Sequence, residues 1–367
     1  MNKAFKRIVV TGGPCAGKST GMVKLAESLS AAGFTPIIVP EAATAVIGTG
    51  LIPGRTIDRF TFQKTLIAWS LAQEDTIRQV VRGMAHSDKV VLIYDRGIMD
   101  GSAYVSDLEW GKLMDEFGAN VSMWRDGRYD AVMHLQTAAI GAEEFYTLAN
   151  NTARSETPEQ ARELDGKTLR AWVGHPHLRV IENNGSTFEQ KMQRLVTEVM
   201  HFLGVPVPLE IEKKFLVEFE PRMWPAEIPL NAVEIEQVYL MNTNPDEEIR
   251  IRKRGQGGFC TYYRTVKRQV HPGVRVETEL QIDAREYKHD LRFQKPGTRI
   301  IRKKRICFVW EGQYLEFDVF TDPSNLCILE IELTTEQDKA CTPPWMHIVR
   351  DVTDDPTYSN ARLAATQ

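Results

Sequence analysis

The feature that most constrains the fold is the segment Gly12–Ser19, which reads Gly-Gly-Pro-Cys-Ala-Gly-Lys-Ser and matches the pattern G-x-x-x-x-G-K-[ST] in full. An apolar run at Ile8–Val10 precedes it, and apolar residues at helical spacing follow it over 22–29. Strand, glycine loop and helix in this order distinguish a phosphate-binding P-loop from a chance glycine turn. The segment therefore predicts a nucleotide-phosphate site at the end of a first strand.

The residue types of this loop serve separate parts of the binding. Glycines let backbone N–H groups curl around an anion, and the helix N-terminus adds its positive dipole end. Lys18 can reach the terminal phosphates, and the Ser19 hydroxyl is a ligand for Mg²⁺. ATP is the default nucleotide and GTP stays open, although no N-K-x-D guanine motif stands out. The residues expected at the nucleotide are Gly12, Gly13, Pro14, Cys15, Ala16, Gly17, Lys18, Ser19 and Thr20.

Length and element order indicate two domains. A chain of 367 residues exceeds the usual size of a single core. From residue 6 to about 204, strand and helix patterns alternate, which predicts an α/β domain with a parallel sheet flanked by helices. The expected strands are 6–11, 36–39, 89–94, 130–135 and 178–181, with long helices at about 58–85 and 187–203. The expected organisation is a P-loop domain over 1–204, a stiff linker, a second domain over 209–350 and a C-terminal tail over 351–367.

Composition bears on the class of ligand and on the cellular compartment. The net charge of −4 gives no global sign of nucleic-acid binding. Five scattered cysteines without a C-x-x-C pair favour reduced thiols and a cytoplasmic protein. The sequence leaves no room for a signal peptide before the first strand, and no apolar run approaches the length of a membrane span.

Two further strand ends carry polar residues. The second strand delivers Glu41, and the third delivers Asp95 followed by Arg96. Ligands of parallel α/β sheets bind beyond the carboxyl ends of the strands, so these side chains should meet the P-loop. Asp95 could hold Mg²⁺ or deprotonate an acceptor hydroxyl, and Arg96 could hold a phosphate. The alternatives are a helix N-cap for Asp95 and a solvated loop residue for Glu41.

A polar stretch over 151–172 offers a lid. Thr157 and Pro158 predict a helix start, with Arg154 in the loop before it and Arg162 in its first turns. These arginines could close over the phosphates and exclude water. The alternative is a solvated helix in which Arg162 pairs with Glu159 and with Asp165.

On these motifs the first half resembles a small P-loop kinase-like ATPase domain, similar to nicotinamide riboside kinase domains and to nucleoside and thymidylate kinases. By that resemblance, Asp95, Arg96 and Glu41 work on the acceptor and the metal. The chain has no D-E Walker B pair, which speaks against a motor-type ATPase.

The second half alternates charged residues at every other position. Side chains at i and i+2 share one face of a strand, so each run marks a charged strand face. A single run would be a solvated edge, but a series that mixes acids and bases favours a closed antiparallel barrel with a charged lumen, which needs bound ions for compensation. The runs are Glu210-x-Glu212-x-Lys214, Arg250-x-Arg252-x-Arg254, Thr265-x-Lys267, Glu277-x-Glu279, Arg302-x-Lys304, Glu316-x-Asp318 and Glu330-x-Glu332.

Over about 209–335 the series resembles the CYTH family, the triphosphate-tunnel fold, whose E-x-E-x-K opening is present. The resemblance implies a polyphosphate ligand and Mg²⁺ or Mn²⁺, with hydrolysis by a metal-activated water. By that resemblance, the phosphate-binding residues are Lys214, Arg250, Arg252, Lys267, Arg302 and Lys304. The metal ligands it implies are Glu210, Glu212, Glu279, Glu330 and Glu332, beside Ser19 and Asp95 in the first domain.

The domain order resembles the TRPL translocation defect protein group, which is described as binding GTP and phosphoinositides. Three functions follow for testing. The first is a metal-dependent P-loop phosphotransferase or NTPase with a tunnel that binds or hydrolyses a triphosphate. The second is a nucleotide-regulated protein whose tunnel grips a phosphoinositide-like ligand. The third is a tunnel triphosphatase with a regulatory P-loop domain.

Overall fold

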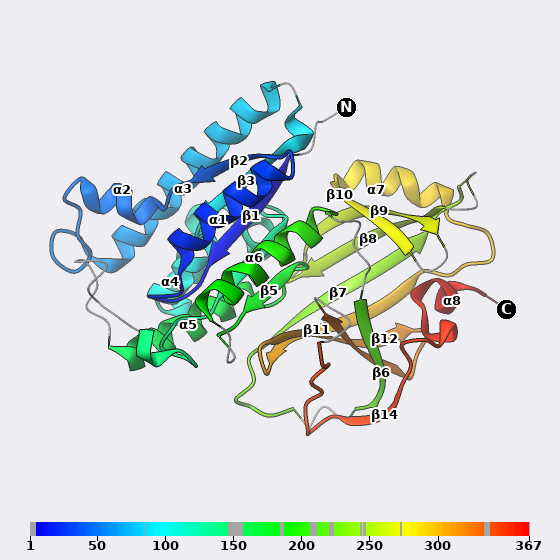
Figure 1. Ribbon diagram of the computed structural model, residues 1–367. Coiled ribbons are helices and arrows are strands. Elements are labelled where there is room, and N and C mark those ends of the chain that lie inside the picture. The colour runs from blue at the N-terminus through cyan, green and yellow to red at the C-terminus, as the bar shows by residue number, and fades with distance from the viewer. Residues whose placement is uncertain are drawn as a thin grey trace. The chain divides into compact units, whose positions relative to one another are not determined.

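A computed structural model describes residues 5–84, 86–145, 157–183, 187–205, 211–219, 224–242, 244, 247–271, 274–333 and 338–366. The chain divides into two compact units, Met1–Met200 and His201–Gln367. Figure 1 draws both units.

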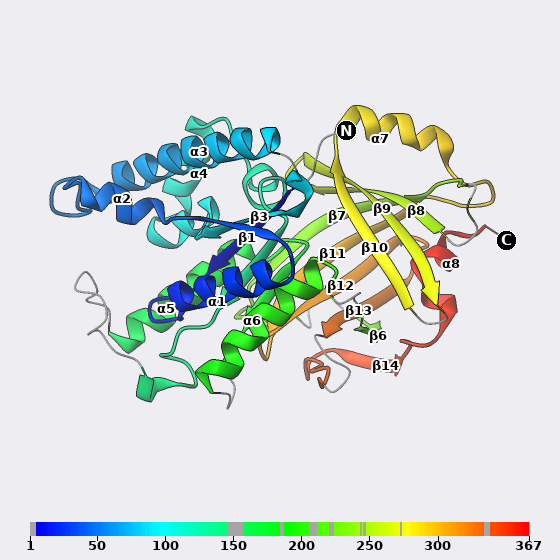
Figure 2. The ribbon, with the colours of Figure 1, turned by 45° about the horizontal axis from the view of Figure 1, so that its top comes forward.

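The first unit is built on a five-stranded parallel sheet in the order β2-β3-β1-β4-β5. Figures 1 and 2 show α1 and α6 on one face of this sheet and α3 and α4 on the other. Because both faces of the central strands are covered, every residue from Val90 to Ile93 is buried, as expected for parallel sheets. The strands are β1 (Lys6–Thr11), β2 (Thr35–Val39), β3 (Val90–Asp95), β4 (Ala131–Leu135) and β5 (Leu178–Ile181).

The helices of this unit follow the sequence signals closely. The Thr157 hydroxyl accepts a hydrogen bond from Gln160 N, and Pro158 opens α5, as the sequence predicted. Asp58 caps the long helix α3 in the same way through Thr61 N. The helices are α1 (Lys18–Ala31), α2 (Ala42–Gly48), α3 (Arg59–Gly83), α4 (Asp107–Glu116), α5 (Pro158–Trp172) and α6 (Phe188–Phe202).

The second unit is built on a nine-stranded antiparallel sheet in the order β10-β9-β8-β7-β11-β12-β13-β6-β14. Strand direction turns markedly across it, from the diagonal β8 to the upright β6 (Figure 1). The strands are β6 (Ile211–Glu218), β7 (Leu230–Tyr239), β8 (Glu247–Gln256), β9 (Phe259–His271), β10 (Val274–Ile282), β11 (Ile301–Trp310), β12 (Gln313–Asp322), β13 (Leu326–Leu333) and β14 (His347–Asp351). The helices are α7 (Ala284–Asp290) and α8 (Asn360–Ala364).

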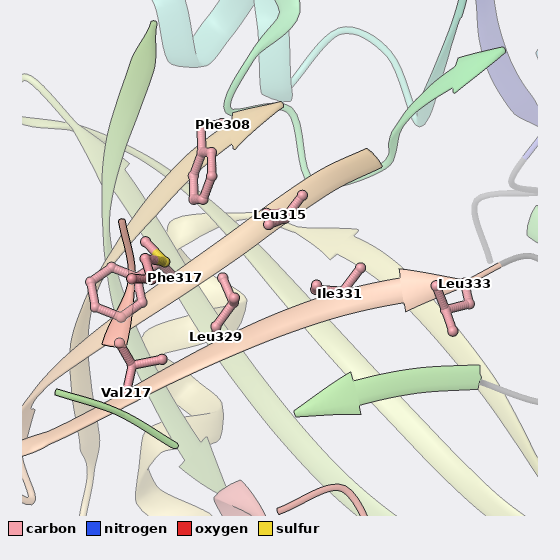
Figure 3. Close-up of a cluster of buried hydrophobic side chains, with 8 residues drawn as sticks. Val217, Phe308, Leu315, Phe317, Leu329, Ile331 and Leu333 are labelled. Carbon is pink, nitrogen blue, oxygen red and sulfur yellow. The ribbon is translucent and has the colours of Figure 1, made fainter. Parts of the chain in front are cut away.

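One face of this sheet is apolar. Figure 3 shows the cluster on β11, β12 and β13, where Phe308, Phe317 and Leu329 pack together. Trp224 and Trp345 from the flanking segments cover this cluster. A second cluster around Ile251 packs against Tyr287 of α7. The apolar face therefore forms the core, which leaves the charged residues on the opposite face.

The C-terminal residues belong to this unit, although the sequence analysis treated 351–367 as a separate tail. Ala364 is fully buried in a cluster with Tyr239, Ile301 and Phe320. Its carbonyl accepts a hydrogen bond from Arg299 N at 2.7 Å. By strand register this cluster lies on the same side of the sheet as the charged residues, so the segment covers one end of the charged face.

Candidate functional sites

The P-loop backbone adopts the curled conformation that its glycines allow. Gly12 and Gly17 have φ angles of 137° and 85°, in the region that favours glycine. A Cβ on Gly12 would lie 2.0 Å from the carbonyl oxygen of Leu135, so no other residue fits there. Helix α1 begins at Lys18, which directs its N-terminus toward the loop.

Lys18 lies half-buried at the centre of the first site. Its Nζ donates to the carbonyl oxygens of Gly12 and Gly13, both at 3.1 Å. Burial, with the nearby charge of Arg96, lowers the pKa of Lys18 to about 7, and the negative charges of Asp95 and Glu41 only partly offset this effect. These mutual charge effects mean that the ends of β2 and β3 meet the P-loop.

Glu41 and Arg96 form an ion pair beside this lysine. Arg96 Nε donates to Glu41 Oε1 at 2.9 Å, and Thr44 Oγ1 donates to Glu41 Oε2 at 3.0 Å. Burial would raise the pKa of Glu41, but the charges of Arg96 and Lys18 outweigh it and lower that pKa. Arg96 holds a φ of 67°, a left-handed conformation that is unfavourable for arginine and is often found at functional sites.

Asp95 is not a helix cap. The following 3₁₀ helix, η2 (Ile98–Tyr104), begins after Gly97, whose N–H donates to Asp100 Oδ2 at 2.8 Å. Burial, with the adjacent charge of Glu41, raises the pKa of Asp95. Within the described residues, Asp95 Oδ1 and Arg96 Nη1 are buried and have no hydrogen-bond partner. Both atoms are therefore suited to a ligand.

Asp100 also belongs to this site and was not predicted from the sequence. This buried carboxylate accepts hydrogen bonds from Thr11 Oγ1 at 2.5 Å and from Trp172 Nε1 at 3.2 Å. The Asp100 side chain therefore links β1 and α5 to the segment that follows β3. A carboxylate three residues after Gly97 fits the capping-box pattern, which was the available signal.

Two further buried residues, Asp165 and Lys191, form hydrogen bonds with the backbone of the P-loop. Asp165 Oδ1 accepts from Gly13 N at 2.7 Å and from Thr137 N at 3.1 Å. Lys191 Nζ donates to Ala16 O at 3.0 Å, and burial lowers the pKa of this lysine to about 8. No local motif marks either residue, because their partners on the loop lie more than a hundred positions away in the sequence.

The lid prediction is only partly covered by the structure. Arg154 lies outside the described residues. Arg162 Nη1 donates to Ala139 O at 2.8 Å, and its Nη2 donates to Glu159 at 3.0 Å. Asp165, the other partner in the solvated-helix alternative, instead accepts hydrogen bonds from the backbone of Gly13 and Thr137. Arg162 thus pairs with a carboxylate of its own helix and with the backbone of the segment that follows β4.

In the second unit, strand register places nearly all of the charged runs on one face, which we call the charged face. Lys214 lies opposite Glu330, and Glu330 lies opposite Glu316. The register continues across β11 and β7 to β8, β9 and β10. By this register the charged face carries Glu212, Lys214, Arg250, Arg252, Arg254, Thr265, Lys267, Glu279, Lys303, Arg305, Glu316, Asp318, Glu330 and Glu332, whereas the side chain of Glu277 lies outside what the structure describes.

Strand β11 departs from the prediction. Arg302 and Lys304 were expected at phosphate, but both are exposed on the opposite face of the strand. Lys303 and Arg305, which are 4% and 8% exposed, lie on the charged face instead. Four consecutive basic residues gave no alternation from which to choose the face, so the structure replaces the first pair with the second.

Buried ion pairs connect this face. Arg305 donates to Asp318 at 2.6 and 2.7 Å and to Glu330 at 2.6 Å, and it also contacts Glu316. Lys303 contacts Asp318 too. Burial would raise the pKa of Glu330, but the charges of Lys214, Lys303 and Arg305 hold it well below its usual range.

The expected metal ligands are less closely grouped. Glu279 accepts from Thr265 Oγ1 at 3.0 Å and lies 3.8 Å from Arg252. Glu212 is partly exposed and Glu332 is exposed, while Glu210 lies outside the described residues. Within the described ranges, no group of three or more His, Cys, Asp or Glu side chains is arranged to hold a metal ion. The carboxylates have the right chemistry for a hard divalent cation, but their present partners are lysine and arginine.

Comparison with known proteins identifies a family for the first unit. The family described as "AAA domain" matches residues 7–191, about half of the chain, and covers the P-loop, Glu41, Asp95 and α5. The chain belongs to this AAA domain family. A comparison with curated proteins finds no match.

Solved structures resemble part of the chain. The inorganic triphosphatase NE1496 is 32% identical over 43% of this chain and 95% of its own, with a TM-score of 0.32. The PH1012 protein from Pyrococcus horikoshii OT3 is 24% identical over 35% of this chain and 79% of its own, with a TM-score of 0.28. No helix in the described part of the chain has the length and apolarity of a membrane span.

Proposed function

We propose that the first unit binds a nucleoside triphosphate with Mg²⁺ and transfers or hydrolyses its terminal phosphate. The observation that carries this proposal is the meeting of Lys18, Glu41, Asp95 and Arg96 at the P-loop. Asp95 Oδ1 and Arg96 Nη1 are buried there and have no hydrogen-bond partner among the described residues. A ligand that carries both phosphate and metal would satisfy both atoms.

Each side chain has a role that fits its position. The Lys18 ammonium leaves the loop carbonyls for the phosphates, and Arg96 donates to the transferring or accepting group. Ser19 and Asp95 would hold Mg²⁺, which supplies charge neutralisation at the phosphates when bound. Asp95 is also suited to take the proton of an attacking hydroxyl, because its raised pKa brings it closer to the pH of the reaction.

The proposal extends to the phosphate acceptor and to the identity of the nucleotide. A small hydroxyl acceptor, such as a nucleoside-like compound, is favoured by the kinase-like motifs over water. ATP is the default nucleotide and GTP is the alternative. A cytoplasmic location is part of the proposal and is supported by the five free cysteines.

For the second unit, we propose that the charged face binds a triphosphate or another polyphosphorylated ligand. Arg250, Arg252 and Arg254 follow one another along one side of β8. Guanidinium groups at this spacing suit a chain of phosphates. Mg²⁺ or Mn²⁺ bound by the carboxylates across the face would complete the charge balance and could activate water.

A nucleotide-regulated binding protein with a phosphoinositide-like ligand is the second candidate. The ion network around Arg305 favours it, because carboxylates already paired to cations support binding without turnover. A triphosphatase with a regulatory P-loop unit is the third candidate.

Phosphate release and transfer from ATP, GTP, tripolyphosphate and thiamine triphosphate, with Mg²⁺ or Mn²⁺, separates the three. Loss of activity only in Lys18→Ala supports the first-unit enzyme. Loss only in the Glu210→Ala, Glu212→Ala double variant supports the triphosphatase. Tight nucleotide retention with no release supports the binding protein. Lys304→Met is the control. Lys304 lies on the face of the sheet opposite to the charged face, so this variant should leave every activity unchanged.

A further inference from the structure

One lysine bridges two carboxylates of the charged face. Lys214 Nζ lies 2.9 Å from Glu212 Oε1 and 3.3 Å from Glu330 Oε1. These acids come from neighbouring strands, β6 and β13. The other oxygen of Glu330 accepts from Arg305 Nη2 at 2.6 Å. The ammonium therefore lies between two carboxylates, where a divalent cation would bridge them.

The ion pair between Lys214 and Glu330 is largely shielded from solvent. The side chains of Lys214 and Glu330 are each 13% exposed, whereas that of Glu212 is 41% exposed. Removing one partner from a sheltered pair costs much more than removing one from a surface pair, since the remaining charge is left uncompensated. A divalent cation that arrives alone must displace the ammonium and leave it unpaired. The open side of the bridge is at Glu212.

We propose that Lys214 holds the cation position between Glu212 and Glu330, and that a divalent cation enters it when a polyphosphate draws the ammonium away. This inference rests on the proposed function of the second unit, because the ligand is taken to be a polyphosphate. In the exchange, Lys214 moves from carboxylate to phosphate and the metal replaces it at the carboxylates. Every charge stays paired only if both ligands bind, so metal and anion promote each other's binding, by the same factor in each direction.

The test is Mn²⁺ binding to the full chain without any anion, followed by electron paramagnetic resonance of free Mn²⁺. Lys214→Met should bind Mn²⁺ more tightly than the wild type, by about 5- to 150-fold, the usual range for coupled sites. Lys304→Met is the matched control, because it removes the same charge from the opposite face of the same sheet. It should leave Mn²⁺ affinity unchanged.

Lys214→Gln gives the same test if the methionine variant does not fold, which circular dichroism would reveal. Equal Mn²⁺ affinities for the Lys214 variant that folds and for Lys304→Met would overturn the inference. So would a wild-type protein that binds Mn²⁺ as tightly as the Lys214 variant.

Calorimetry with tripolyphosphate in the presence of Mn²⁺ separates this inference from the proposed function, because the inference itself makes anion binding weak when metal is absent. If the wild type fails to bind tripolyphosphate while the Lys214 variant gains Mn²⁺ affinity, the polyphosphate function fails and the cation position stands. If tripolyphosphate binds and the Lys214 variant gains nothing, the function stands and the cation position of Lys214 is wrong.

Discussion

The ammonium of Lys18 donates a hydrogen bond to the carbonyl oxygen of Gly12, 3.1 Å away. The P-loop lysine is thus paired with its own loop, and desolvation in this half-buried position lowers its pKa to about 7. A nucleotide that takes the place of this carbonyl would meet a lysine that is only partly protonated at neutral pH.

This relationship predicts that nucleotide binding takes up a proton. Phosphates favour the charged lysine, so binding raises the pKa of Lys18 toward its ordinary value of 10.5. Above pH 7 the free protein is largely neutral at Lys18, and the affinity for nucleotide should fall by up to about tenfold per pH unit until the bound-state pKa is reached. Calorimetry at pH 8 in two buffers with different ionisation enthalpies should show uptake approaching one proton. Equal heats in both buffers would contradict it.

A second prediction concerns the support beneath the loop. Asp165→Ala leaves the buried N–H groups of Gly13 and Thr137 without their acceptor, which should cost about 2–4 kcal/mol of stability. Asp165→Asn retains an acceptor oxygen and should cost less. Urea unfolding of the two variants measures the difference, and equal losses would show that these hydrogen bonds contribute little.

The third prediction concerns the ion pairs of the charged face. Asp318→Ala leaves Lys303 and Arg305 partly uncompensated in a buried position, which should cost about 3–5 kcal/mol. Asp322→Ala is the control: this acid is 39% exposed and lies 3.6 Å from Arg299, so its loss should cost less than about 1 kcal/mol. Chemical denaturation gives both values. Similar losses in the two variants would mean that the network is not energetically distinct from a surface pair.

Much of the architecture was readable in the sequence because local patterns set it. The P-loop string, the apolar strands before Glu41 and Asp95, and the cap at Thr157 all act within a few residues. The two-residue period likewise placed most charged runs on one side of the second sheet. On β11 this reasoning failed, because the basic run 302–305 has no polar–apolar alternation.

The missing parts of the first site depend on distant contacts. Asp165 and Lys191 reach the P-loop from α5 and α6, and Asp100 reaches Thr11 from beyond β3. Neither composition nor periodicity reports such pairings, since they arise only when the helices pack on the sheet. For the same reason, no local pattern predicted that Ala364 packs on the second sheet.

The most direct test of the account is tripolyphosphate binding by Arg252→Met and Arg302→Met. The two arginines lie on opposite faces of the second sheet, and both variants remove one guanidinium from it. If the charged face is the polyphosphate site, Arg252→Met should weaken binding by at least about tenfold, the effect of losing one charge-assisted contact, and Arg302→Met should leave it unchanged. Equal weakening in both variants, or loss only in Arg302→Met, would contradict the assignment of the site to this face.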